Sequence, residues 1–200
     1  MGETPPRIRC EGWRFVPQSF AVVHQFQALA LEDAGVDVTV RDLPYFGDWS
    51  PVSGLLPHTL EDRLKRMPLG VSDDTVSGVI RVAVPYDFSA SGDIPTLVMA
   101  TAEAGEIPTE NIVGGQTAGA AVAASDARVY APSRWSRDGL VLSGIPEDRI
   151  DIVGHGIDPS IWCPPYGARR TDLRQRFGWC DDLVFLNVGA MTENKGIDLL

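Results

Sequence analysis

The segment NVGAMTENKGIDLL, residues 187–200, carries residue types that suit the binding of an anion. Gly189 follows an apolar run, 183–188, that predicts a buried strand, and Lys195 opens a predicted helix. Glycine lets a ligand approach the backbone closely, and free amides at a helix N-terminus favour anions, so this corner suits a phosphate. A glycine turn followed by Lys-Gly is also common without any ligand, and the segment matches neither a Walker A loop nor G-x-G-x-x-G.

Acidic residues follow two other predicted strands. Asp87 comes after an apolar run at 79–84, where it could contact an acceptor, and Glu103 comes after a run at 96–101. The Glu103 carboxylate could orient an acceptor hydroxyl or simply cap the next segment. The catalytic residues stay unassigned, with Glu103 and Asp87 as candidates. His24 is interpreted as a partly buried polar contact on a helix, and not as a base.

Short strands and helices alternate through the first three quarters of the chain, which predicts a Rossmann-like parallel sheet covered on both faces. Ser19 is a predicted N-cap and Gly35 a predicted C-terminal stop for the first helix. Ser133 and Gly144 do the same for a later helix. The irregular, proline-punctuated segment 43–77 predicts a surface excursion with one helix near 59–67. Strands are predicted at 7–10, 36–40, 79–84, 96–101, 128–131 and 149–153, and a further helix at 117–124.

A second alternation of predicted helix and strand follows a stretch rich in glycine and proline. Thr171 is a predicted N-cap for a helix that ends at Phe177, and Gly178 is its predicted stop. The predicted organisation is therefore a first Rossmann-like domain at 1–157, an interdomain linker at 158–170, and the first elements of a second Rossmann-like domain at 171–200.

The composition of the chain indicates which classes of partner are disfavoured. The 200-residue chain has a formal net charge of −10, which disfavours non-specific binding to nucleic acid or to anionic lipid. The three widely spaced cysteines, Cys10, Cys163 and Cys180, indicate neither a disulfide framework nor a zinc site, and they predict a cytoplasmic location. No run is apolar enough to span a bilayer and no signal peptide is visible, although peripheral contact with a membrane stays compatible with the sequence.

Several short motifs in the second half of the sequence, which we call anchors, occur in the same order as in a known family. The stretch 129–200 resembles the junction of the group 1 glycosyltransferases, which are retaining enzymes of the GT-B fold, with two Rossmann-like domains facing each other across a cleft. A weaker resemblance covers ALALEDAGVDVTV near the N-terminus. The anchors are Pro132-Ser133, Gly144, Gly156-Ile157-Asp158, Trp162-Cys163-Pro164, Gly189 and Lys195-Gly196.

The resemblance implies transfer of a sugar, with retention, from a nucleotide diphosphate sugar to a saccharide or other hydroxyl acceptor, without a metal or cofactor. The first domain would correspond to the acceptor-side domain, and the second would hold the donor. By this resemblance Gly189, Thr192 and Lys195 contact the donor phosphates. The turn formed by His155, Gly156 and Asp158 lines the cleft.

The chain also departs from the family pattern. Ala190 stands where many members carry an arginine, the glycine-rich loop after the first strand is missing, and Thr101-Ala102-Glu103 replaces a Thr-x-His motif. The family's paired glutamates are expected beyond Leu200, so the chain is expected to be a truncated piece that is inactive by itself. Two rival interpretations stay open: a non-catalytic α/β module that binds a ligand or partner, and an unrelated Rossmann-like enzyme.

Overall fold

The structure is a computed structural model that describes residues 5–45, 48–70, 76–160, 162–186 and 188. The chain divides into two compact units, Met1–His155 and Gly156–Leu200. We call them the first unit and the second unit and describe each by itself.

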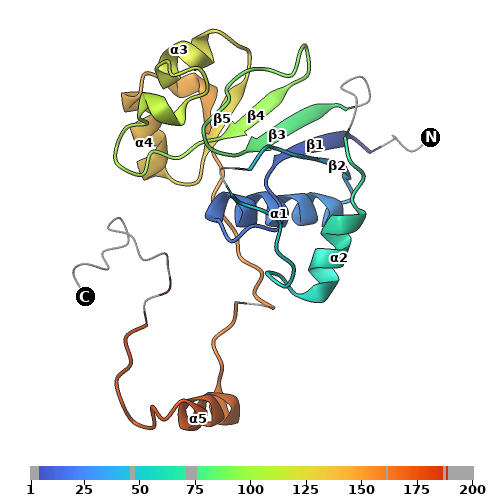
Figure 1. Cartoon of the computed structure of the whole chain (residues 1–200). Coiled ribbons are helices and arrows are strands. Elements are labelled where there is room, and N and C mark those ends of the chain that lie inside the picture. The colour runs from blue at the N-terminus through green and yellow to red at the C-terminus, as the bar shows by residue number, and fades with distance from the viewer. Residues whose placement is uncertain (1–4, 46–47, 71–75, 161, 187, 189–200) are drawn as a thin grey trace. The chain divides into compact units, whose positions relative to one another are not determined.

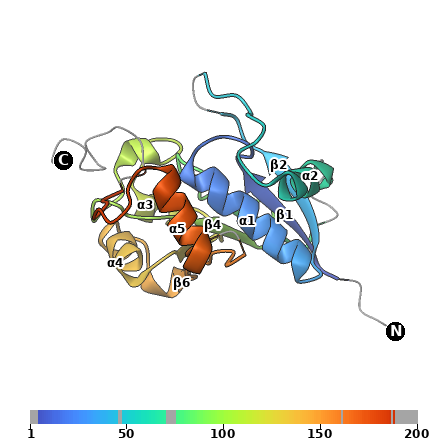
Figure 2. The same ribbon diagram turned by 90° about the horizontal axis from the view of Figure 1, so that it is seen from below.

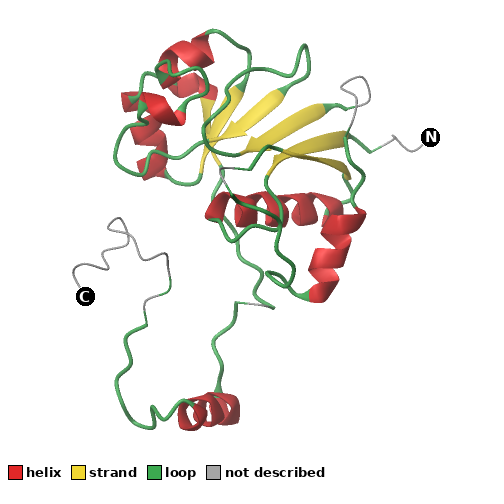
Figure 3. Ribbon diagram, viewed as in Figure 1, coloured by secondary structure: helices red, strands yellow, loops and turns green. Residues whose placement is uncertain are grey.

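The first unit contains one sheet of six strands in the order β2-β1-β3-β4-β5-β6. Every neighbouring pair of strands in it is parallel. Figure 3 shows the strands fanning out with the twist that such sheets adopt. The strands are β1 (Arg7–Gly12), β2 (Asp37–Asp42), β3 (Gly78–Val82), β4 (Thr96–Met99), β5 (Arg128–Ala131) and β6 (Ile150–Ile152).

Helices cover the sheet. Figure 1 shows α1 and α2 below it, whereas α3 and α4 lie on the other side, near β4 and β5. This arrangement is an α/β fold of the Rossmann-like kind, as the sequence predicts. The helices of this unit are α1 (Ser19–Asp33), α2 (His58–Arg66), α3 (Ala118–Ala123) and α4 (Arg134–Leu142), with short 3₁₀ turns at Thr109–Asn111 and Glu147–Arg149.

The ends of the helices follow local chemistry. Gly35 and Gly144 adopt φ angles of 81° and 86° after α1 and α4, a region that glycine enters without steric cost. The hydroxyl of Ser133 accepts a hydrogen bond from the Ser136 N–H and caps α4, as predicted. The predicted Ser19 cap is wrong. The Gln18 side chain caps α1 instead, because its amide oxygen accepts hydrogen bonds from two free N–H groups in the first turn of the helix.

Two clusters of apolar side chains form the interior of the first unit. The smaller cluster joins α1 and α2 to β1 and β2 through Cys10, Ala28, Val40 and Leu64. Figure 2 shows α1 lying along β1, with α2 beside β2. The larger cluster extends from Trp13 and Phe20 to the side chains of β4, β5 and α4. Burial on this scale is the main force that stabilises a domain.

The second unit contains little regular structure in its described residues. Its one helix in the described part, α5 (Gly167–Arg176), begins before Thr171, so the predicted Thr171 cap is wrong. Thr171 lies inside the helix, where its hydroxyl donates to the Gly167 carbonyl. The predicted strand at 183–188 is also wrong for its described residues, which form no strand. A strand needs a hydrogen-bonded neighbour, and the apolar run has none in the described part of the chain.

Among the residues that the structure describes, no helix combines the length and apolar character that a membrane crossing requires.

Candidate functional site at the carboxyl ends of the strands

The direction of the sheet order reverses at β1. The chain leaves β1 toward β2 on one side and returns to β3 on the other, so the segments after β1 and β3 diverge. In open parallel sheets, ligands bind in the crevice outside the carboxyl ends of the strands at such a reversal. The segments that follow β1 to β4 are therefore the expected location of a ligand site.

The loop after β1 is held by buried polar contacts. Trp13 is only 2% exposed, and its Nε1–H donates to the carbonyl of Pro44 at 3.0 Å. Arg14 donates to both carboxylate oxygens of Asp42, at 2.8 and 2.7 Å, and to the carbonyl of Leu64. A bidentate pair of this kind fixes the guanidinium group as well as neutralising it. The charge of Arg14 is therefore neutralised by a partner within the protein.

Phe15 occupies a backbone conformation that is unusual for a bulky residue. Its φ is 62°, in the left-handed region, which costs about 1–3 kcal/mol for such a side chain. The Phe15 N–H donates to the Gln25 side chain at 2.9 Å, and the Phe15 carbonyl accepts from the Val52 N–H at 2.6 Å. These two bonds hold the strained residue in place. Strain of this kind is enriched at binding sites.

The segment between β2 and α2 is anchored to the loop after β1. The Leu43 N–H donates to the carbonyl of Gly12, and the Tyr45 hydroxyl donates to the carbonyl of Arg14, each at 3.0 Å. Farther along, the Gly54 N–H donates to the Glu61 carboxylate at 2.8 Å. Trp49 packs edge-on against Trp13, with ring centroids 5.9 Å apart. The irregular segment between β2 and α2 is therefore fixed against the loop after β1.

Glu103 lies at the carboxyl end of β4, exposed in the turn that follows it. Close by, the buried Tyr86 hydroxyl donates to the Thr101 carbonyl at 3.0 Å and accepts from the Thr101 N–H at 3.1 Å. Burial raises the pKa of Tyr86 to about 12; the bond to Thr101 lowers it, and the Glu103 charge raises it further. Tyr86 therefore stays protonated and joins the segments after β3 and β4. The structure leaves the Glu103 carboxylate accessible to a ligand.

His24 is fully enclosed beneath the loop after β1. It is 1% exposed, and its Nε2 has no hydrogen-bond partner. Its ring packs so closely on Gly12 that a Cβ there would lie 2.6 Å from the ring. Burial, and secondarily the Arg14 charge, lower the pKa of His24 to about 4, against a smaller opposing effect of Asp42. His24 is therefore a neutral part of the interior, and its burial is greater than the sequence predicts.

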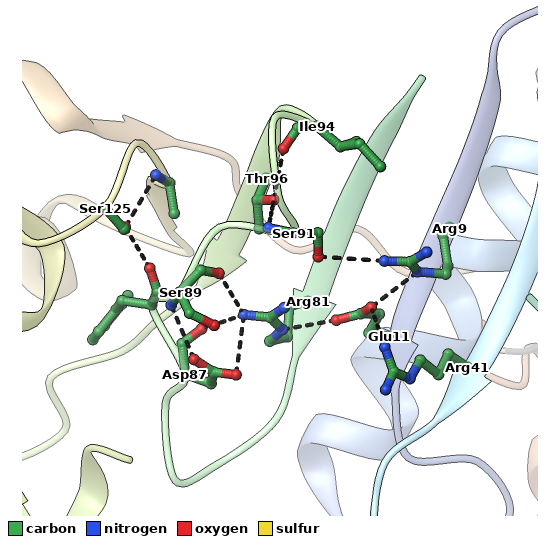
Figure 4. A network of polar contacts seen from close by, with 12 residues as sticks. Arg9, Glu11, Arg41, Arg81, Asp87, Ser89, Ser91, Ile94, Thr96 and Ser125 are labelled. Atoms are coloured by element: carbon green, nitrogen blue, oxygen red, sulfur yellow. Dashed lines mark hydrogen bonds and ion pairs between the residues drawn. The ribbon is translucent and has the colours of Figure 1, made fainter. Parts of the chain in front are cut away.

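Asp87 belongs to an ion network on the face of the sheet opposite α1. Arg9 and Arg81 each donate through Nε to the Glu11 carboxylate, at 2.9 and 2.8 Å, and all three side chains are buried (Figure 4). Arg81 also donates to the carbonyls of Asp87 and Ser89. The Asp87 carboxylate lies 3.4 Å from Arg81. Asp87 thus helps to fasten the β3–β4 segment over the sheet.

This network was not predicted from the sequence. Arg9 and Glu11 alternate with Ile8 and Cys10 in β1, and an alternating strand is normally interpreted as having one solvated face. The available signal was a third charge, Arg81, at the matching position of β3, in register with Glu11. Opposite charges at facing positions of neighbouring strands can compensate each other when the face is covered.

The phosphate-binding residues predicted in the second unit, Gly189, Thr192 and Lys195, lie outside the described residues. Of the predicted cleft turn, His155 and Gly156 are exposed. The Asp158 carboxylate accepts hydrogen bonds from the Ser160 N–H and hydroxyl, at 2.8 and 2.6 Å. Asp158 therefore stabilises a local turn.

Metal ligands are sparse among the residues that the structure describes. No group of three or more histidine, cysteine or acidic side chains converges in the described ranges to hold a metal ion. Burial raises the pKa of the Cys10 thiol to about 12, which keeps it protonated and unreactive. Cys163 and Cys180 are exposed free cysteines. The exposed Glu103 carboxylate is the described strand-end group that can orient a polar ligand by hydrogen bonding.

Comparison with known proteins adds no assignment. No protein-family model matches the sequence, and no curated protein is similar enough to count as a relative.

Proposed function

We propose that the first unit is the acceptor-side domain of a retaining glycosyltransferase of the GT-B type, which uses a nucleotide diphosphate sugar as donor. The observation that carries the proposal is the reversal of the sheet order at β1, with the exposed Glu103 carboxylate at the carboxyl end of β4. The ordered anchors between Pro132 and Lys195, which resemble those of group 1 glycosyltransferases, support it.

The proposed chemistry divides between the two units. An acceptor hydroxyl would lie at the strand ends of the first unit, where the Glu103 carboxylate could accept its proton in a hydrogen bond. Departure of the nucleotide diphosphate builds negative charge, which the ammonium of Lys195 and nearby backbone amides would stabilise. Removing one such group from a site with little water costs about 3 kcal/mol in the transition state.

Titration with nucleotides tests the donor half of the proposal. The protein would be expressed from its complete reading frame and titrated calorimetrically with UDP, GDP, ADP and NAD. We expect one diphosphate to bind better than NAD. Lys195→Ala should weaken that binding at least about tenfold. Lys65→Ala is the matched control, because Lys65 is the only other lysine of the chain and forms an ion pair with Glu61 in α2.

Three outcomes would reject the assignment. Preference for NAD would favour an unrelated Rossmann-like enzyme, and equal weakening by Lys195→Ala and Lys65→Ala would show that the lysine forms no specific phosphate site. Binding of no nucleotide at all would favour a non-catalytic module. A Glu103→Gln variant that transfers sugar at the wild-type rate would remove Glu103 from the proposed mechanism.

A further inference from the structure

A hollow of about 260 Å³ lies at the start of β2, which is an edge strand of the sheet. It is lined by residues 36–38, by Met67 and Pro68 after α2, and by charged side chains from the ends of α1 and α2. Figure 2 shows α2 beside β2. Sites for drug-sized ligands usually measure about 300–1,000 Å³, so this smaller hollow suits the end of a chain. The candidate site, by contrast, lies at the carboxyl ends of the strands.

The backbone at the start of β2 presents unpaired polar groups to this edge. In a parallel strand, alternate residues direct their N–H and C=O groups to the same neighbour. The Asp37 N–H donates to the Pro6 carbonyl on the β1 side, at 3.2 Å, so the Val36 carbonyl and the Val38 N–H point outward. Neither of these two groups has a hydrogen-bond partner in the described part of the chain. An unpaired N–H is unusual in a residue that, like Val38, is only 5% exposed.

The segment after α2 adds a short parallel bridge farther along the same edge. The Val40 N–H donates to the Pro68 carbonyl, and the Gly70 N–H donates to the Val40 carbonyl, each at 2.9 Å. Val40 is thereby paired with Leu69. One step closer to the start of β2, the matching donor would be the N–H of Pro68, which proline lacks. The added strand therefore stops at Pro68, beside the hollow.

Four charged side chains line the hollow: Glu32, Asp37, Arg63 and Arg66. Ion pairs of 2.6 Å or less join Glu32 to Arg63, Arg63 to Asp33, and Asp37 to Arg7. Arg66 is exposed in the last turn of α2, and its guanidinium forms no ion pair with any residue that the structure describes. The six charges cancel in total. Attraction of an anion would therefore depend on the position of the Arg66 guanidinium, and not on a net field.

We propose that this hollow binds the C-terminal residue of an extended peptide, which adds to the edge of β2 as a parallel strand. The N–H of that residue would donate to the Val36 carbonyl, and its carboxylate would accept from the Val38 N–H and the Arg66 guanidinium. Pro68 occupies the next position along the edge, so a longer parallel chain would meet it. Strand addition and capture of a terminal carboxylate are both known modes of peptide recognition. The site is independent of the proposed sugar transfer.

The test is a heteronuclear NMR titration of the full 200-residue protein with acetyl-Ala-Val-Ala, as the free acid and as the C-terminal amide. The valine of the probe would lie on the same face as Val36, which packs against the smaller apolar cluster. We expect the free acid to shift the Val38 amide resonance and to slow its hydrogen exchange. The amide should bind about fivefold more weakly, because it lacks the charge that pairs with Arg66.

Arg66→Gln should weaken binding of the free acid about fivefold and remove its advantage over the amide. Arg134→Gln is the matched control, because Arg134 is also an exposed arginine in a helix, and it has no ion pair within the described ranges. It should leave the affinity for both peptides within about twofold. The net charge of −10 opposes general binding of an anionic peptide, so a preference for the free acid requires a specific cation.

Four results would overturn the inference. These are binding of neither peptide, equal binding of the free acid and the amide, binding without a response of the Val38 amide, and equal effects of Arg66→Gln and Arg134→Gln. Acetyl-Ala-Glu-Ala-amide carries its carboxylate on a side chain. If it bound as well as the free acid, recognition of a chain terminus would be contradicted. The comparison of free acid with amide uses the wild-type protein, so it decides the question even if a variant fails to fold.

Discussion

The two units use similar sequence patterns with different results. In the first unit, Val79, Val82, Val98 and Met99 lie buried in strands β3 and β4, because each strand has parallel neighbours. In the second unit, Leu183, Phe185 and Leu186 are equally apolar, but they are 84%, 90% and 76% exposed. The comparison shows that an apolar run specifies a strand only where other strands can pair with it.

The helices show the same difference. α1 buries side chains along its length, including Phe20, Ala28 and Leu29, against the sheet. α5 buries none, and no described residue of the second unit is buried. A short helix without buried side chains is marginal in water, since packing supplies most of the stability of helices in proteins. The stability of the described structure should therefore reside in the first unit, and substitutions can test that expectation.

The largest expected effect comes from Glu11. Replacing Glu11 with alanine would leave the buried Arg9 and Arg81 guanidinium groups without their shared carboxylate. Breaking a buried ion pair by removing one partner costs about 3–5 kcal/mol. We expect a loss of that size in the free energy of unfolding, measured by urea denaturation followed by circular dichroism.

Asp87→Ala is the matched control for Glu11→Ala. The Asp87 side chain is 40% exposed and lies 3.4 Å from Arg81, and the carbonyl that Arg81 also uses survives the substitution. Its cost should be about 1 kcal/mol or less. Equal losses in the two variants would show that burial does not set the strength of this network.

The next effect depends on pH. The folded-state pKa of His24 is about 4, below the ordinary value of 6.5 expected in the unfolded chain. Above pH 6.5 both states hold neutral His24, so it causes no loss. As the pH falls from 6.5 toward 4, the unfolded state takes up a proton that the folded state does not. The fold should lose about 3 kcal/mol across this window, with the loss levelling off below pH 4.

His24→Leu should remove this contribution. Denaturation at a series of pH values would give the difference between the wild type and the variant, which cancels the titration of shared carboxylates. His58→Gln serves as the control, because His58 is exposed on α2. Wild-type and His24→Leu stabilities that run parallel between pH 6.5 and 4 would contradict the burial of a neutral imidazole.

Much of the first unit can be predicted from local sequence. Strand 128–131 agrees with β5 at both ends, and Ser133, Gly35 and Gly144 perform their predicted roles at helix ends. These features depend on residues close together in the chain, so local patterns determine them. The Arg9–Glu11–Arg81 network escaped prediction because it joins two strands and is buried by a third segment.

The candidate site was less predictable for the same reason. The anchoring bonds from Tyr45 to Arg14 and from Val52 to Phe15 join segments on either side of α1 and β2. No local pattern indicates that the segment after β2 would lie against the loop after β1. The sequence does indicate Glu103 as a residue at a strand end, because the preceding apolar run is a strong strand signal.

The smallest effect compares one glycine from each unit. A Cβ on Gly139 of α4 would meet the Gly105 carbonyl oxygen and would lie 2.5 Å from the Ala102 Cβ. Because these neighbours are backbone or fixed to it, Gly139→Ala should cost about 1–3 kcal/mol through overpacking. A Cβ on Gly156, in the second unit, would meet nothing within 4 Å. Gly156→Ala should therefore leave the free energy of unfolding within about 0.5 kcal/mol of the wild type.

Thermal and urea denaturation of both variants would measure the difference in cost between the two substitutions. An equal cost of Gly156→Ala and Gly139→Ala would contradict the comparison, because it would require the second unit to be as tightly packed as the first.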